Sequence, residues 1–438
     1  MIDYIKVNWK DDPDLEFVSR FSRSILGSTP DPLLQQALSE VNKAHAVISE
    51  IQAVAGGTAI IQETLNLESE TPNNRTFIIR NTGDRNDLPI PGTSTINSVV
   101  DFYRPDILPT GDSNEDTSAW TPVKQSTYDD FIASVNNNNS AYFSTLIHAG
   151  EGKSGFVRGS VKDPYSQKEM DLLYQSLQKD ILNPKNFQQS NFAVTHGNGI
   201  DYTNDQLLEF ISSGNVSLIW SPVSNLLLYQ DTHDIRKLLD RNINICLGSD
   251  WSPSGSKHVL DELKFAEFAN DLLDLKLSRI ELFKMVTLNP ARVLGTTQNG
   301  RIREGANADL FVCRKKKRDD NALDALLEGS DKDISFVMVN GRIVFGLKSF
   351  FKENLQVDFQ EFPPQEGAGV AERGVSINSA LNFNLADSLE IIDILMRRYC
   401  STVIAKPNLQ RTRFLSSDDD VYNNNIKSLK ATLLKLYA

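Results

Sequence analysis

The sequence between residues 142 and 250 contains YFSTLIHAG (142–150), NFAVTHGNG (191–199), NVSLIWSP (215–222) and INICLGSD (243–250), four short apolar runs that each end in glycine or polar residues. Runs of this length with such endings are typical of buried strands. Amphipathic stretches separate them, namely EMDLLYQSLQKDIL (169–182), NDQLLEFISSG (204–214) and THDIRKLLDRN (232–242). Strands that alternate with helices predict a parallel sheet built from βαβ units.

Similar runs precede these four, namely GGTAIIQ (56–62), RTFIIRN (75–81) and INSVVDFY (96–103). The alternation is compatible with an open doubly wound sheet or with a closed barrel of eight strands. A doubly wound nucleotide-binding fold requires Gly-x-Gly-x-x-Gly after its first strand, and GGTAII does not provide it. We therefore predict an α/β fold, a (β/α)8 TIM-type barrel that lacks its first strand.

The segments around these runs differ in character. Apolar residues at helical spacing before residue 50 predict a helical lead-in. The stretch 256–296 predicts helix with a break at Asn289-Pro290, where Asn would cap and Pro would take the first position. Glycine-turned, β-rich sequence after it predicts part of a small β-sandwich beside the barrel. The predicted regions are a helical lead-in (1–50), a barrel (51–298), a β-sandwich segment (299–350), a Pro/Gly linker (351–374) and a helical C-terminal region (375–438).

The composition narrows the class of partner. The 438 residues carry 45 Lys+Arg against 57 Asp+Glu, a formal charge of −12 at pH 7, which disfavours binding to a phosphate backbone. No apolar run reaches about 18 residues and the first ten residues have no signal-peptide core, so we expect a cytoplasmic protein outside the membrane. Three distant cysteines predict no disulfide framework. A small-molecule substrate is expected, and the sequence leaves a homo-oligomer open.

Polar side chains stand at the ends of the predicted strands, where barrel enzymes place their chemistry. They are His148, Glu151, His196, Trp220 and Asp250. Imidazoles and a carboxylate are the usual ligands of catalytic Zn²⁺ or Fe²⁺, which lowers the pKa of bound water. A nearby carboxylate can then move the proton from that water to a leaving nitrogen. The alternative is structural, with Asp250 as a turn residue or a helix cap.

Six blocks of sequence, in the right order over roughly residues 50–345, resemble the amidohydrolase superfamily, most closely its chlorohydrolase/deaminase branch. The blocks are HAGEG (148–152), THGNG (195–199), WSPVSNLLLY (220–229), LGSDWSPSGSK (247–257), VTLNPARVLG (286–295) and GRIREGANADLFV (300–312). The resemblance implies that His148, His196 and Asp250 bind one Zn²⁺ or Fe²⁺ and that Glu151 is the proton shuttle. It also implies hydrolysis of C–N or C–halogen bonds in small, often heterocyclic, molecules.

Two departures from the family pattern stand out. Trp220 replaces the histidine of the seventh strand, which disfavours purine or cytosine deamination; its indole would either stack on a ring or fill the barrel mouth. With Ser224, Asn225 and Trp251 it predicts a substrate pocket with aromatic walls. In addition, no His-x-His occurs anywhere in the sequence, although the family's first strand supplies two metal ligands from that motif.

Three hypotheses follow from the missing motif. The chain could be a truncated or split amidohydrolase that needs an N-terminal piece, a non-catalytic relative that binds a ligand or a partner, or a working hydrolase with an altered metal site. We favour a metal-dependent hydrolase acting on C–N bonds, other than peptide bonds, of a small cyclic amide, imine or amine. The metal would be weakly bound or absent if His-x-His is indispensable.

Overall fold

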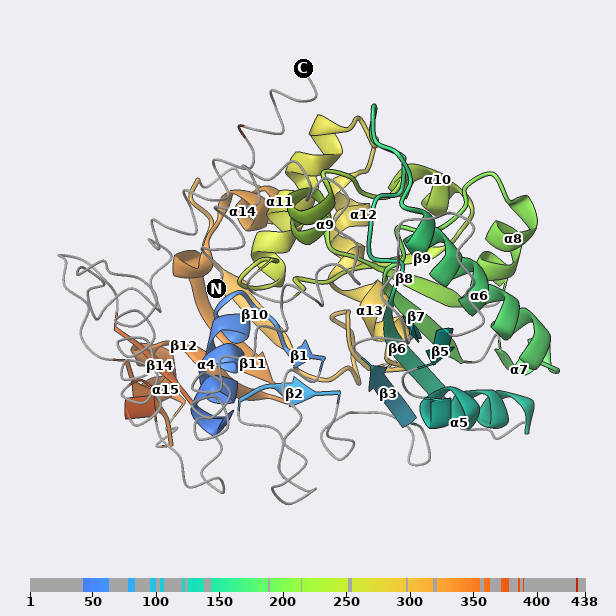
Figure 1. Cartoon of the computed structure of the whole chain (residues 1–438). Helices are drawn as coiled ribbons and strands as arrows, with labels where there is room; N and C mark the ends of the chain where they lie inside the picture. Colours follow the sequence, from blue (N-terminus) through green and yellow to red (C-terminus); the bar gives the residue numbers. More distant parts are fainter. Residues whose placement is uncertain are drawn as a thin grey trace, which may run out of the picture.

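Parallel strands and flanking helices form the central part of the molecule in this computed structural model (Figure 1). The structure describes residues 42–62, 78–82, 95–99, 103–105, 120–122, 125–137, 143–187, 190–213, 215–250, 254–296, 298–317, 321–354, 358–362, 372–377, 385–386, 389 and 431. The larger parallel sheet has the order β3-β6-β7-β8-β9. Its strands are β3 (Thr95–Val99), β6 (Phe143–Ala149), β7 (Asn191–His196), β8 (Val216–Trp220) and β9 (Asn244–Leu247).

A second parallel pair consists of β1 (Ile60–Ile61) and β2 (Arg80–Asn81). Together the two sheets contain a strand in each of the seven predicted runs, so the α/β class is confirmed. Within the described residues, β1 and β2 pair only with each other. Closure into a barrel, and the missing first strand, therefore stay predictions.

Helices follow the strands as the amphipathic stretches predicted. They are α6 (Pro164–Asp180) after β6, α8 (Asp205–Ser213) after β7, and α9 (Pro222–Tyr229) and α10 (Ile235–Asp240) after β8. In α6, Met170, Leu173, Tyr174 and Leu177 are buried at the spacing of one helix face. Every residue of β7 is buried, as expected for a parallel strand covered on both sides. Smaller elements are α5 (Gln125–Asn136), α7 (Pro184–Phe187) and the antiparallel pair β4 (Tyr103–Pro105) and β5 (Trp120–Pro122).

The helical stretch after β9 is divided differently from the prediction. It forms α11 (Val259–Leu272), α12 (Arg279–Met285) and α13 (Leu288–Val293). The predicted cap at Asn289 is wrong, because the cap position is Thr287 and α13 begins at Leu288, two residues before the predicted start at Pro290. Asn289 instead donates its side-chain amide to the Ile245 carbonyl at 2.7 Å, which ties α13 to β9. Pro290 is tolerated because the N–H it lacks has no helical partner in a first turn.

The predicted β-rich segment forms an antiparallel sheet of order β10-β11-β12-β14-β13. Its strands are β10 (Leu310–Cys313), β11 (Ile334–Val339), β12 (Arg342–Leu347), β13 (Gln360–Glu361) and β14 (Arg373–Val375), with α14 (Ala322–Glu328), the 3-10 turn η4 (Asp331–Asp333) and α15 (Lys348–Glu353) between them. The prediction of a linker at 351–374 needs correction, because β13 and most of β14 lie inside it and extend the sheet.

The ends of the chain are described only in part. Helix α4 (Asn42–Ala55) agrees with the end of the predicted lead-in and packs on β11 and β12, at the left of Figure 1. Its Glu50 carboxylate accepts hydrogen bonds from the backbone N–H groups of Ile78 and Ile79, at 2.7 and 3.0 Å, just before β2. The rest of the predicted lead-in and almost all of the predicted C-terminal helical region lie outside the described residues. None of the described helices has the length and apolarity needed to cross a membrane.

A buried ion pair joins Arg80 of β2 to Asp309, the residue before β10, and so connects the parallel pair β1–β2 to the antiparallel sheet. The side chains are 3% and 5% exposed, so removing Asp309 takes away a buried counter-charge of Arg80. We expect Asp309→Ala to lower the free energy of unfolding by about 3–5 kcal/mol, measured by urea denaturation. Asp240→Ala, which breaks an exposed ion pair with Arg236, is the control and should cost less than about 1 kcal/mol. Equal losses in both variants would contradict the prediction.

Candidate metal centre

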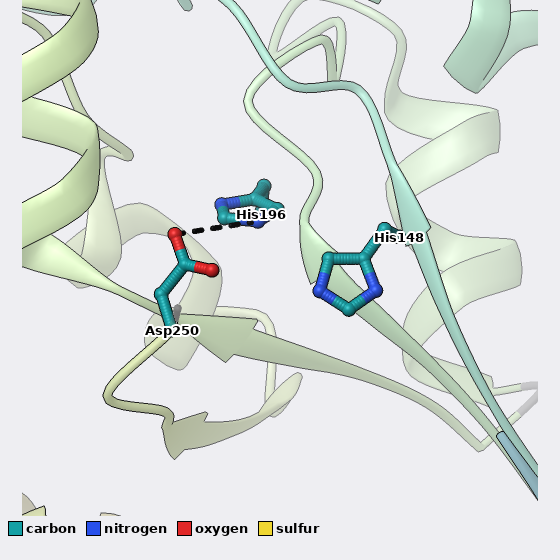
Figure 2. Close-up of side chains that lie close together, drawn as sticks. All are labelled: His148, His196 and Asp250. Atoms are coloured by element: carbon teal, nitrogen blue, oxygen red, sulfur yellow. Dashed lines mark ion pairs between the residues drawn. The ribbon is translucent and has the colours of Figure 1, made fainter. Parts of the chain in front are cut away.

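Three predicted ligands meet at the carboxyl ends of three strands of the larger parallel sheet. His148 lies near the end of β6, His196 is the last residue of β7, and Asp250 follows β9. One ligand atom from each side chain lies within 4.8 Å of the others. Figure 2 shows both imidazoles and the carboxylate converging from these separate segments. Two imidazole nitrogens and a carboxylate oxygen form a donor set that suits Zn²⁺ or Fe²⁺.

Negative charge is concentrated around His196. Its Nε2 lies 3.5 Å from Oε1 of Glu151 and 3.9 Å from Oδ2 of Asp250. The three side chains are only 0%, 2% and 5% exposed, so solvent screens these charges weakly. The Nε2 atom is buried without a hydrogen-bond partner in the described part of the chain. A divalent cation would fit this set of residues, since it would neutralise the carboxylates and use the imidazole nitrogen.

The backbone around the centre is unusual at two of the three positions. His196 and Asp250 have φ angles of 69° and 57°, in the left-handed region that ordinary side chains avoid. Gly197 follows His196 in the same region at 65°. Such conformations cost free energy and persist where the surrounding structure holds them, often at functional sites.

The carboxylate of Glu151 is held by a residue that the sequence did not single out. The Tyr229 hydroxyl, at the end of α9, donates to Oε2 of Glu151 at 2.8 Å. The other oxygen, Oε1, is the one that lies toward His196. Tyr229 closes one of the quoted sequence blocks, yet only the packing of α9 against the β6 loop reveals its target.

The predicted substrate-contacting residues are mostly enclosed by protein. Trp220 is completely buried, and its indole N–H donates to the Thr232 hydroxyl at 2.7 Å. This contact favours the space-filling alternative for Trp220. Ser224 and Asn225 are also completely buried. Trp251 lies outside the described residues. A direct role of these four in substrate binding stays a prediction.

His233 holds the backbone of His196. Its Nε2 contacts the His196 carbonyl oxygen, and its Nδ1 lies 2.9 Å from the Tyr202 hydroxyl. Burial lowers the pKa of His233 to about 4, so its ring is neutral at physiological pH. A neutral ring has one N–H, and a carbonyl can only accept, so His233 donates from Nε2 and accepts from Tyr202.

The loop that follows β6 is fastened by Asp231, another residue absent from the sequence prediction. Its carboxylate accepts from the backbone N–H groups of Gly155 and Val157, at 2.6 and 3.0 Å, and from the Ser160 hydroxyl at 2.6 Å. Asp231 is itself completely buried. The loop carrying Glu151 is therefore anchored to the segment after α9.

Asp163 ends this loop and caps α6, accepting from the Tyr165 N–H at 3.0 Å. Burial raises the pKa of its carboxyl from 3.8 to about 6. Because the folded protein binds this proton more tightly than the unfolded chain, the protonated Asp163 carboxyl stabilises the fold. This stabilisation is fully present below about pH 4 and is lost as the pH rises through 6. Asp163→Asn keeps the capping oxygen without the charge, so it should be more stable than the parent above pH 7, by up to about 3 kcal/mol. Denaturation at several pH values tests this; a stability difference that does not shrink on acidification would contradict it.

Part of the chain matches known proteins. Residues 186–344 match the model of the Amidohydrolase family. Over 152 residues the chain is 31% identical to the 5-methylthioadenosine/S-adenosylhomocysteine deaminase of Pyrococcus furiosus, covering 33% of this chain and 36% of that protein. It is 27% identical to the 5'-deoxyadenosine deaminase of Methanococcoides burtonii over 152 residues, or 33% and 35% of the two chains. The matches thus span little more than a third of these two curated relatives.

Among solved structures, the atrazine chlorohydrolase of Arthrobacter aurescens complexed with zinc is 16% identical, with a TM-score of 0.44 over 76% of this chain and 79% of that one. That score is too low to bear on fold or activity. The family match runs from the residues before β7 to within β12 and includes His196 and Asp250, whereas His148 and Glu151 precede it.

Proposed function

We propose, from the match of residues 186–344 to the Amidohydrolase family, that the chain is a member of the amidohydrolase superfamily and a metal-dependent hydrolase of C–N bonds, other than peptide bonds, in small molecules. The observation that carries the proposal is the convergence of His148, His196 and Asp250 with the Glu151 carboxylate beside them. Two imidazoles and two carboxylates thus lie together at the carboxyl ends of strands of one parallel sheet. This end of a parallel sheet is also where α/β enzymes carry out their chemistry.

His148, His196 and Asp250 would hold one divalent ion, Zn²⁺ or Fe²⁺. Such an ion supplies positive charge and lowers the pKa of a water molecule. Glu151 accepts a proton from the attacking water and returns it to the leaving nitrogen. The Tyr229 hydrogen bond orients that carboxylate, leaving Oε1 directed toward the centre. Asp250 provides a second carboxylate that can accept the proton of the water.

We infer a small cyclic amide, imine or amine as substrate. The two relatives above are named as deaminases of adenosine derivatives, so ring amines belong in the first set of compounds to test. Trp220 stands where the family pattern has a histidine, and this replacement disfavours purines relative to cyclic amides and imines. The proposed place of action is the cytoplasm.

Metal analysis together with a hydrolysis assay tests this function. The purified full chain should bind about one Zn²⁺ or Fe²⁺ and should release ammonia or a ring-opened acid from members of such a panel. A metal content far below one per chain, with no activation by added Zn²⁺, Fe²⁺ or Mn²⁺, would refute it. Bound metal without turnover would instead support a ligand-binding protein, a second candidate favoured by the absence of His-x-His from the sequence.

A further inference from the structure

A buried chain of hydrogen bonds leads from a backbone carbonyl to the side of His196 away from the centre. The Asn198 amide nitrogen donates to the Gly152 carbonyl at 2.9 Å. The Asn225 amide nitrogen donates to Oδ1 of Asn198 at 3.1 Å. The Asn225 Oδ1 lies 3.3 Å from Nδ1 of His196. Asn198, Asn225 and His196 are completely buried, so water cannot substitute for these partners. We call the Gly152 carbonyl, Asn198 and Asn225 the amide relay.

The relay has only one chemically consistent direction. A backbone carbonyl accepts hydrogen bonds and never donates them, so Asn198 must present its NH₂ group to Gly152. The Asn198 oxygen then faces Asn225, so Asn225 must donate to it from its own NH₂ group. The Asn225 oxygen is thereby turned toward His196, where only an N–H can meet it. The proton of a neutral His196 ring is therefore placed on Nδ1.

A second contact is compatible with the same orientation of Asn225. Its amide nitrogen also lies 3.5 Å from the Thr232 hydroxyl, which accepts from the Trp220 indole. The backbone of Asn225 is held in the first turn of α9 by its N–H to the Ser221 carbonyl at 2.9 Å. Turning the Asn225 amide over would bring two carbonyl oxygens together, those of Asn198 and Asn225, with no proton between them.

We propose that Asn198 and Asn225 are positioning residues that lock His196 in its Nδ1–H form and aim the lone pair of Nε2 at the candidate metal centre. The part concerning metal rests on the proposed function, whereas the part concerning the proton on Nδ1 does not. Metal-binding histidines are commonly oriented by a hydrogen bond from their other ring nitrogen, and loss of that partner costs about 10–100-fold in affinity.

An amide suits this position better than the carboxylate that often plays this role. Two carboxylates already lie within 4 Å of His196 Nε2, at 3.5 and 3.9 Å. A third buried negative charge on the far side of the ring would add repulsion in a poorly screened environment. The neutral relay orients the imidazole and leaves the charge of the centre unchanged.

The proton position can be read without any metal. Two-bond ¹H–¹⁵N spectra of the ¹⁵N-histidine-labelled, metal-free full chain, recorded at alkaline pH, should show one neutral ring protonated at Nδ1 that disappears in His196→Gln. Asn225→Asp keeps an acceptor oxygen and should keep this form. A His196 ring protonated at Nε2 in the parent chain, or in Asn225→Asp, would overturn the relay.

Zinc affinity, measured by competition with a chromogenic chelator, tests whether the orientation of His196 contributes to metal binding. Asn225→Leu removes the acceptor at similar volume and should weaken zinc binding about 10–100-fold. The matched control is Asn191→Leu at the opposite end of β7, where a completely buried amide donates to the Asn215 carbonyl and the Ser217 hydroxyl at 2.9 Å. This control should lose comparable stability while keeping its zinc affinity.

The outcomes separate the two proposals. If the parent chain binds no zinc but His196 carries its proton on Nδ1, the proposed function fails and the relay stands. If zinc binds tightly and Asn225→Leu binds it as well as the parent, the relay fails and the function stands. Equal losses of affinity in Asn225→Leu and Asn191→Leu would also overturn the relay, because they would reflect general loosening of β7.

Discussion

Replacing Asp250 with alanine is expected to remove both metal binding and hydrolysis. Asp250 supplies the single carboxylate of the three-residue donor set, and its side chain is only 5% exposed. Residues that merely hydrogen-bond to ligands contribute about 10–100-fold in affinity, so loss of a ligand should exceed about 100-fold. Chelator competition with Zn²⁺ and single-turnover assays measure the two effects.

The control for this variant shares its backbone conformation. Asp274 also has a left-handed φ, 52° against 57° for Asp250, but it is exposed and pairs with Lys276 at 2.8 Å. Asp274→Ala imposes a similar conformational penalty at an exposed position that contributes no ligand, and it should leave zinc affinity unchanged. Retention of zinc by Asp250→Ala would refute its assignment as a ligand and would leave it as a turn residue.

Replacing Glu151 with glutamine should separate metal binding from turnover. Glutamine has nearly the shape of glutamate and cannot take a proton from water, so we expect kcat to fall about 10²–10⁴-fold. The donor set of His148, His196 and Asp250 stays intact, so the metal content should be unchanged. Steady-state kinetics and elemental analysis of the same preparation provide both quantities.

The Tyr229→Phe variant serves as the graded comparison. It removes the 2.8 Å hydrogen bond to Glu151 and keeps the carboxylate. Hydrogen bonds to charged groups contribute about 1.5–3 kcal/mol, so kcat should fall roughly 10–100-fold, less than in Glu151→Gln. If Glu151→Gln also loses the metal, Glu151 would be a ligand, which its 3.5 Å separation from His196 Nε2 makes the sharpest rival assignment.

The sequence allowed the seven strands and the positions of His148, His196 and Asp250 to be predicted, because strand periodicity places polar residues at the carboxyl ends of parallel strands. Neither β13 nor β14 was predicted, since strands of two or three residues depend on their pairing, β14 with β12 and β13 with β14, rather than on local propensity.

The partners of the candidate site could not be derived in the same way. Asn198 and Asn225 stand 27 positions apart and meet only because β7 and β8 are neighbours in the sheet. From the sequence, Asn225 was placed in the substrate pocket, whereas in the structure its side chain contacts Asn198 and His196. Tyr229 reaches Glu151 across 78 residues, a distance over which no local pattern carries information.

The left-handed φ angles at His196 and Asp250 limit which ligands mutation can place there. Histidine, asparagine and aspartate enter this region more readily than other side chains, whereas an ordinary residue costs roughly 1–2 kcal/mol. A cysteine, the ligand that soft metals prefer, would carry this penalty at either position. Directed evolution of this centre toward thiolate ligands would therefore lose stability at two of its three positions, while exchanges between imidazole and carboxylate avoid this penalty.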